Sequence, residues 1–169
     1  MKSLTPLPVE QIPETLPRTQ ARARPDSWSD VLIVGAGPTG LACAIEIHKA
    51  GIKAMLMDQS FVAGIGNLYS DEMLYQAGLR YDRPANTLTA TEVRRLYRAM
   101  VETLADAIKH RGSSLADEQY RDLFGEVGDF QGSHQVYDRE GQACRRCRNV
   151  IVRVKSGGRS TFFCEHCQV

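Results

Sequence analysis

The chain has 169 residues and 43% of them are hydrophobic, so it is long enough for one ordinary domain or two small ones. A formal net charge of +1 points by itself to no class of partner. Apolar runs stay well short of the ~20 residues that cross a bilayer, and the N-terminus has no secretory h-region. We therefore expect neither a membrane partner nor a signal peptide.

Residues 1–28 form the first predicted segment, a disordered or extended leader. Five of the seven prolines lie within the first 25 residues, and the stretch has no sustained hydrophobic period. Its arginines could form a short basic arm, but a solvated leader is the simpler interpretation.

Residues 29–58 have the pattern of a partial βαβ unit. An apolar run at 31–34 suits a buried parallel strand. The glycines that follow have the G-x-G-x-x-G spacing of a turn that places pyrophosphate on a helix N-terminus, and an acid for a ribose hydroxyl comes 18 residues later. These candidate dinucleotide-binding residues are Gly35, Gly37, Gly40 and Asp58. With these residues the stretch resembles the FAD-binding start of flavin-dependent oxidoreductases.

This fragment is too small to bind a dinucleotide on its own. An incomplete βαβ unit leaves its sheet edges open, and a doubly wound domain buries them with further strands and helices. No second βαβ pattern follows in the sequence. We therefore expect no binding of FAD or NAD, and interpret Cys43 as a buried core thiol.

Residues 52–59 fit two structures. The dinucleotide pattern requires a second strand here. Ile52, Met55 and Leu56 instead follow the i, i+3, i+4 spacing of a helix, and Ala, Met and Leu are good helix formers. The helix is favoured, and the strand remains open.

The sequence of residues 59–133 predicts two helices joined by a long turn. In "VAGIGNLYSDEMLYQAG", Asn67 can cap a helix and Gly78 can end it. Thr89 and Glu92 have capping-box spacing before a second helix, which Gly112 stops. Apolar residues on that second helix form a stripe that predicts its core face: Val93, Leu96, Tyr97, Met100, Val101, Leu104 and Ile108.

Residues 134–169 carry the strongest signal, the spacing C-x2-C-x16-C-x2-C. Four thiolates with this spacing can close a tetrahedral structural zinc site. The intervening sequence predicts a β-hairpin whose turn is formed by Gly157 and Gly158. The expected ligands are Cys144, Cys147, Cys164 and Cys167. Two disulfides are the alternative, and His166 is interpreted as a bystander.

The same segment is basic. Six Arg and Lys residues lie within residues 145–159, which suits contact with nucleic-acid phosphates, although an ordinary solvated surface is the alternative. Arg159 directly follows the hairpin turn. Residues 113–130 are acidic by contrast, with five acids and one arginine.

Residues 52–169 contain five ordered motifs: "IKAMLMDQSFVAGIGNLYSDE", "RPANTLT", "GSSL", "VYDREGQACRRC" and "GGRSTFFCEHCQ". With these motifs the segment closely resembles the C-terminal half of formamidopyrimidine-DNA glycosylases. The resemblance implies a helix–two-turn–helix segment, a zinc finger, phosphate contacts by Asn67 and Arg159, and a lid over a flipped base around residues 113–130. It also implies binding of damaged or abasic duplex DNA, and we expect a monomeric bacterial protein of the cytoplasm and nucleoid.

The family's nucleophile is an N-terminal proline followed by a glutamate, whereas Lys2 and Ser3 stand here. The sequence therefore predicts an α+β chain that has the DNA-binding part of a base-excision repair enzyme. Its glycosylase and abasic-site lyase activity is left open. A repair enzyme completed by another chain and a remnant of an FAD-dependent oxidoreductase are the alternatives. The expected domains are 1–28, the partial βαβ fragment 29–58, the helical region 59–133 and the zinc finger 134–169.

Overall fold

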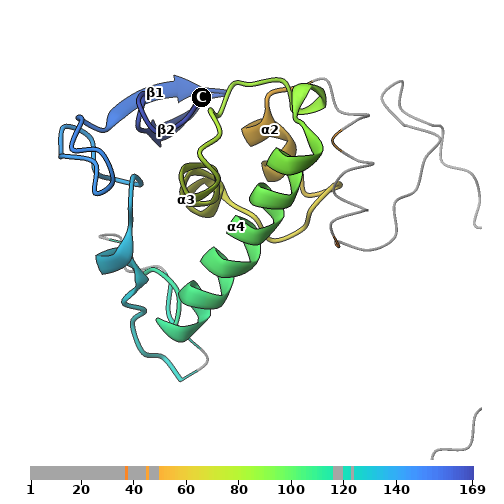
Figure 1. Ribbon diagram of the computed structural model, residues 1–169. Helices are drawn as coiled ribbons and strands as arrows, with labels where there is room; N and C mark the ends of the chain where they lie inside the picture. Colours follow the sequence, from red (N-terminus) through yellow and green to blue (C-terminus); the bar gives the residue numbers. More distant parts are fainter. Residues whose placement is uncertain (1–36, 38–44, 46–49, 116–119, 123) are drawn as a thin grey trace, which may run out of the picture. The chain divides into compact units, whose positions relative to one another are not determined.

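The computed structural model describes residues 37, 45, 50–115, 120–122 and 124–169 (Figure 1). The predicted leader therefore lies outside the described residues, as do the first strand of the βαβ pattern, Gly35, Gly40 and Cys43. No helix in the described part of the chain is long and apolar enough to cross a membrane.

Helix α2 spans Ile52–Met57, so the helical alternative for this stretch is confirmed and the second strand of the βαβ pattern is wrong. Ile52, Met55 and Leu56 are completely buried on one face. The N–H groups of Ile52 and Lys53 donate to carbonyls of the later turn, at Arg83 (2.8 Å) and Tyr81 (3.1 Å). These bonds provide acceptors that the first turn of a helix lacks within itself.

Helix α3 spans Asn67–Ala77 and ends as predicted at Gly78, whose φ is +67°. The N–H of Leu79 donates to the carbonyl of Leu74 and that of Gly78 to Tyr75, the two bonds of a Schellman motif. The predicted cap at the other end is wrong. Asn67 is the first helical residue, the N-cap is Gly66, and no side chain caps the helix.

Helix α4 spans Ala90–Lys109 and follows the short 3-10 helix η2, Ala85–Thr87. Its predicted capping box is present: the Glu92 N–H donates to Thr89 Oγ1, and the Thr89 N–H donates to Glu92 Oε2. Arg83 holds the same carboxylate with both terminal nitrogens, at 2.6 and 3.0 Å. The hydrogen bond from Arg83, followed by that from the Thr89 backbone, lowers the pKa of Glu92 to about 2.

The apolar stripe on α4 is only partly core. Val93, Leu96 and Met100 are buried, but Val101 is 50% exposed and Ile108 is 76% exposed, so the prediction is wrong for these two. The main core cluster lies among α2, α3 and the buried face of α4 and also includes Ile45.

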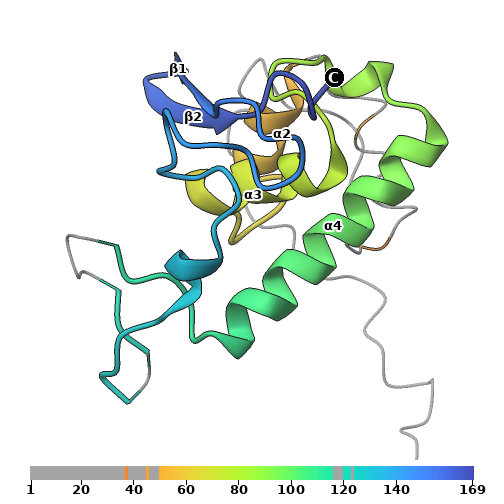
Figure 2. The same cartoon turned by 60° about the vertical axis from the view of Figure 1, so that its left-hand side comes forward.

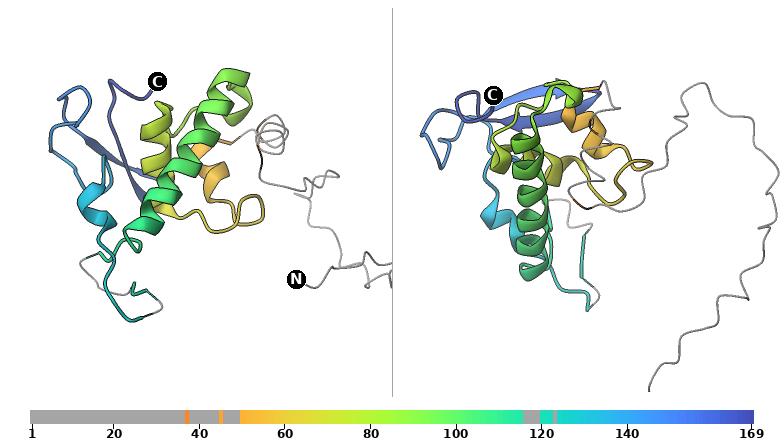
Figure 3. Two further views of the ribbon diagram at one scale, coloured as in Figure 1. Left: turned by 60° about the horizontal axis from the view of Figure 1, so that its bottom comes forward. Right: turned by 45° about the vertical axis from the view of Figure 1, so that its right-hand side comes forward.

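Strands β1, Val152–Ser156, and β2, Arg159–Phe163, form an antiparallel hairpin. Its two-residue turn is Gly157 and Gly158, both with positive φ, as the sequence predicts. Figures 1 and 2 show α3 between this hairpin and α4. A short 3-10 helix, η3 at Phe130–Ser133, lies beside the C-terminal half of α4 (Figure 3).

Candidate metal centre and nucleic-acid interface

The four predicted cysteines come together in one cluster. Their Sγ atoms all lie within 4.8 Å of one another. Cys144 and Cys147 come from a turn before β1, while Cys164 and Cys167 come from a turn after β2. Sγ–Sγ separations across the two turns are 3.9 Å for Cys144 to Cys167 and 3.4 Å for Cys147 to Cys164. The ring nitrogens of His166 do not belong to this cluster of ligand atoms.

This geometry fits a tetrahedral zinc ion. Zn–S bonds of about 2.3 Å place tetrahedral sulfurs about 3.8 Å apart. All four cysteines are free thiols, so the alternative of two disulfides does not describe the structure. The Arg146 N–H also points at Cys144 Sγ, at 3.4 Å.

The surroundings of the cluster also favour a cation. Burial opposes ionisation of Cys144, but hydrogen bonds led by that from the Tyr75 hydroxyl outweigh burial and lower its pKa to about 6. Burial, followed by hydrogen bonds among the neighbouring sulfurs, raises the pKa of Cys167 far above its usual range. A metal ion would compensate the negative charge of these sulfurs and so favour their thiolate form.

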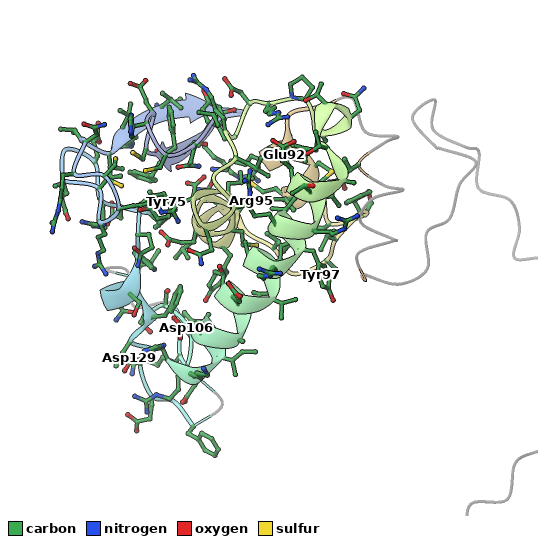
Figure 4. The ribbon with its side chains drawn as sticks, viewed as in Figure 1. Tyr75, Glu92, Arg95, Tyr97, Asp106 and Asp129 are labelled. Carbon is green, nitrogen blue, oxygen red and sulfur yellow. The ribbon has the colours of Figure 1, made fainter. Side chains whose placement is uncertain are left out.

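The finger is joined to α3 through buried polar side chains. Glu72 accepts hydrogen bonds from the N–H groups of Gln135, Val136 and Tyr137, at 2.8–2.9 Å. Tyr75, also on α3, packs in the core cluster of the finger, and its hydroxyl lies 3.2 Å from Cys144 Sγ (Figure 4). Helix α3 therefore contributes to both cores.

The two predicted DNA contacts, Asn67 and Arg159, lie close together although 92 positions separate them in the chain. Asn67 Nδ2 donates to the carbonyl of Ser160 at 2.9 Å, and Ser160 follows Arg159. Arg159 is exposed, and its side chain forms no hydrogen bond or ion pair with the part of the chain that the structure describes. The first turn of α3, uncapped by any side chain, is thus joined to the strand residue that follows an exposed arginine.

Several other basic residues of the finger have structural partners. Arg146 stacks over the Tyr75 ring, with its guanidinium carbon 4.5 Å from the centroid. Arg153 stacks on Phe162 and pairs with Glu140, and Arg145 donates to the carbonyl of Gly132. These guanidinium groups therefore bind the protein itself, unlike that of Arg159.

The lid predicted at residues 113–130 is described only in part, since residues 116–119 and 123 lie outside the described ranges. At its base, Ser113 Oγ lies 3.0 Å from His134 Nε2, and Ser114 Oγ donates to the carbonyl of Tyr120. The Asp129 N–H donates to the carbonyl of His110, which joins the far end of the segment to the end of α4.

Two of the four dinucleotide-binding candidates, Gly35 and Gly40, lie outside the described residues. Gly37 is the only one of the three glycines that is described. Asp58 follows a helix instead of a strand, and its Oδ1 accepts from the Ser60 N–H (2.9 Å) and hydroxyl (2.5 Å). The predicted pairing of a ribose-binding acid with a second β-strand is therefore wrong.

Sequence reasoning missed the buried charges that connect these parts: Lys53, Asp71 and Glu72, which are at most 5% exposed. Only "SDE", two adjacent acids in the middle of a predicted helix, could have suggested carboxylates that face inward.

The fold and the cysteine cluster define a helix–two-turn–helix unit followed by a four-cysteine zinc finger. The H2TH domain of formamidopyrimidine-DNA glycosylase matches residues 36–119, and the zinc finger found in FPG and IleRS matches residues 141–169. The chain therefore carries the C-terminal half of the formamidopyrimidine-DNA glycosylase family. Because the H2TH match begins at residue 36, it covers most of the predicted βαβ fragment, and nothing supports a separate FAD- or NAD-binding unit.

Individual relatives agree with this assignment. The formamidopyrimidine-DNA glycosylase of Desulfitobacterium hafniense is 42% identical over 158 residues, which cover 91% of this chain and 57% of the relative. That of Thermus thermophilus is 49% identical over 117 residues, covering 69% of this chain and 44% of the relative. The chain thus spans about half the length of the curated relatives it matches.

Solved structures show the same likeness. The crystal structure of MutM (Fpg) from Thermus thermophilus has a TM-score of 0.75 and 44% identity, covering 78% of this chain and 50% of that one. The Lactococcus lactis Fpg in complex with DNA containing an abasic site has a TM-score of 0.72 and 33% identity, covering 78% and 48%.

Proposed function

We propose that this chain binds damaged or abasic duplex DNA by its phosphates, with Asn67 and Arg159 as the central contacts. The observation that supports this most strongly is the hydrogen bond from Asn67 to Ser160. It joins the first turn of α3 to the strand residue that follows Arg159, so that helix N–H donors and an exposed arginine come from neighbouring segments. Both are preferred binders of phosphate oxygens.

Within this proposal, the amide of Asn67 has one N–H engaged with Ser160 and a second available to a phosphate. Its Oδ1 is buried and has no hydrogen-bond partner among the described residues. Because phosphate oxygens only accept hydrogen bonds, the Nδ2 side of Asn67 is the side that a phosphate would use.

A structural zinc ion, one per chain, completes the proposal. It would be held by Cys144, Cys147, Cys164 and Cys167, and by closing the two turns it would fix the ends of the β1–β2 hairpin. Fixing the hairpin also fixes Arg159, which lies at its turn. Zinc content of the purified, reduced protein tests this directly, and protein free of zinc would contradict it.

The experiment for DNA binding compares the unchanged protein with Arg159→Ala on duplexes that contain a tetrahydrofuran abasic-site analogue. Binding should weaken steeply as salt rises, since each neutralised phosphate releases counterions. Arg159→Ala should lower affinity by similar factors on abasic and intact duplexes and reduce the salt slope by about one.

Lys109→Met is a matched control because it removes one exposed positive charge from the end of α4. If Arg159→Ala and Lys109→Met weaken binding equally, general charge and not a phosphate site explains the binding.

A further inference from the structure

The polar cluster that connects the helices to the hairpin centres on Lys53. This lysine is 5% exposed, and its Nζ donates to Asp71 Oδ1 at 2.6 Å and to Thr161 Oγ1 at 2.7 Å. Asp71 is 1% exposed, and its other oxygen accepts from the Phe162 N–H at 3.0 Å. One buried ion pair therefore connects α2, α3 and β2.

The contacts of this cluster fall on consecutive residues of β2. Asn67 binds the carbonyl of Ser160, Lys53 binds the side chain of Thr161, and Asp71 binds the N–H of Phe162. Asn67 and Asp71 are one turn apart on α3. Together they hold β2 against the helices over the three residues that immediately follow Arg159.

Stability alone does not account for an ion pair in this position. Removing two charges from water costs about as much as their attraction returns, so a buried pair is often no more stable than an apolar pair of similar size. An ion pair with fixed hydrogen bonds does, however, allow fewer alternative alignments of the strand than an apolar contact.

Lys53 also lies close to the surface that would bind phosphate. Lys53 and Arg159 line the same pocket of about 380 Å³, whose other lining residues include the acids Asp58 and Asp82. The charge of Lys53 is neutralised by Asp71, whereas Arg159 at the same pocket has no acidic partner among the described residues. Of the two cations, Arg159 is therefore the one left for a ligand.

We propose that Lys53 is a positioning residue of the DNA-phosphate site: through Asp71 and Thr161 it fixes β2 against α3 and so holds Arg159 beside Asn67. The proposal rests on the DNA binding proposed above. Lys53 acts here through Arg159 and makes no phosphate contact itself.

The test uses the double variant Lys53→Met/Asp71→Asn in the full chain. Both charges are removed together, so the net charge is unchanged and no unpaired charge stays buried. The amide introduced by Asp71→Asn retains an oxygen that can accept from the Phe162 N–H. Affinity for the tetrahydrofuran duplex is measured for this variant, for Arg159→Ala, and for the combination of all three substitutions, with zinc content measured for each protein.

We expect the double variant to keep its zinc and to lose about tenfold in affinity, a coupling typical of residues in one network. In the Arg159→Ala background the same two substitutions should lower affinity by less than about twofold, because the guanidinium that they position is already gone. A merely structural role would lower affinity equally in both backgrounds.

Equal losses in the two backgrounds, or no loss in the unchanged background, would overturn the role of Lys53 while leaving the phosphate site in place. Loss of zinc from the double variant would likewise overturn it, since the pair would then be supporting the finger as a whole. If the unchanged protein does not bind duplex DNA, or if Arg159→Ala behaves as Lys109→Met does, the proposed function itself fails.

Discussion

Glu72 shows how one side chain can join two parts of the molecule. It is 3% exposed and accepts three backbone N–H groups from the segment that leads into the finger. Burial raises the pKa of Glu72, and the bonds from Tyr137, Val136 and Gln135 oppose that effect. An ionised carboxylate satisfies all three donors, because each of its oxygens only accepts.

Glu72→Gln should destabilise the fold by about 1–3 kcal/mol, the cost of leaving a buried N–H without an acceptor. The amide NH₂ group would face an N–H donor at one of the two oxygen positions. Urea unfolding with zinc present in excess measures the change. Glu102→Gln, at an exposed position of α4, is the control and should change stability by less than about 0.5 kcal/mol. Equal stability of the two variants would contradict the anchoring role of Glu72.

His134 is a second buried group, and it makes stability depend on pH. It is 3% exposed and packs edge-on against the rings of Phe130 and Tyr137. Burial lowers the pKa of His134 to about 4, from an ordinary value of 6.5. The unfolded chain therefore binds a proton between these pH values that the folded chain does not, so stability falls as pH drops from about 6.5 toward 4.

His134→Gln should reduce the decrease in the free energy of unfolding between these pH values. The measurement is the difference in unfolding free energy between the two proteins across that pH range. Asp71, whose pKa burial raises to about 6, and Cys144, whose pKa is lowered to about 6 against the effect of burial, also titrate in acid. These groups are common to both proteins, so the difference isolates His134. If the free energies of unfolding of the two proteins changed in parallel with pH, His134 would not be the group responsible.

At the scale of elements, the end of α3 is built to touch the finger closely. Gly78 ends the helix with a φ of +67°, and a Cβ added there would lie 3.2 Å from the carbonyl oxygen of Cys167. The N–H of Val169 donates to the carbonyl of Gly78, and Gln168 binds the carbonyl of Leu79. The absence of a side chain thus serves both the helix end and the packing of the second cysteine turn.

Gly78→Ala should destabilise the protein by at least about 1–2 kcal/mol, since alanine is strained in the left-handed region even before the contact with Cys167 is counted. Thermal unfolding of the zinc-loaded protein measures it. Gly132→Ala is the matched control, because nothing lies within 4 Å of an added Cβ there and its φ is not positive. Equal melting temperatures for the two variants would show that the close contact is unimportant.

Local rules predicted the elements whose signals lie within a few residues. The capping box of α4, the glycine end of α3, the two-glycine hairpin turn and the paired cysteine spacings are all of this kind. Each depends on chemistry between neighbours in the chain, so the sequence alone contains enough information.

Contacts between distant segments explain what could not be predicted. Helix α2 has acceptors for its first N–H groups only because the turn at residues 81–83 packs beside it. The arginines of the finger look available in the sequence, yet Arg146 and Arg153 stack on aromatic rings from other positions. Asn67 has the residue type of a helix cap, but its side chain binds Ser160 instead.

At the scale of the described part of the molecule, two cores share helix α3. One lies among α2, α3 and α4, and the other surrounds Val136, Ile151 and Phe162 with the buried cysteines. Tyr75, Asp71 and Glu72 reach from α3 toward the second core. Loss of the finger would therefore leave polar groups on α3 without partners. We therefore expect the stability of the helices to depend on zinc.

Removing zinc with a chelator should abolish DNA binding and lower the thermal transition of the remaining helices. Without the cation the cysteines would take up protons and no metal–sulfur bond would join the two cysteine turns. The turns would open, and the hairpin that carries Arg159 would lose its fixed ends. Most helical signal in far-UV circular dichroism should remain at low temperature, because the core of α2, α3 and α4 does not contain the cysteines. Restoring zinc should restore both binding and the original transition.

The same chelator saturated with zinc beforehand is the control, and it should change neither property. Complete unfolding on chelation would show that the helices have no stability apart from the finger. Unchanged DNA binding in zinc-free protein would be the more serious result: Arg159 would then reach its phosphate without an ordered hairpin, and the hydrogen bond between Asn67 and Ser160 could not be what places it.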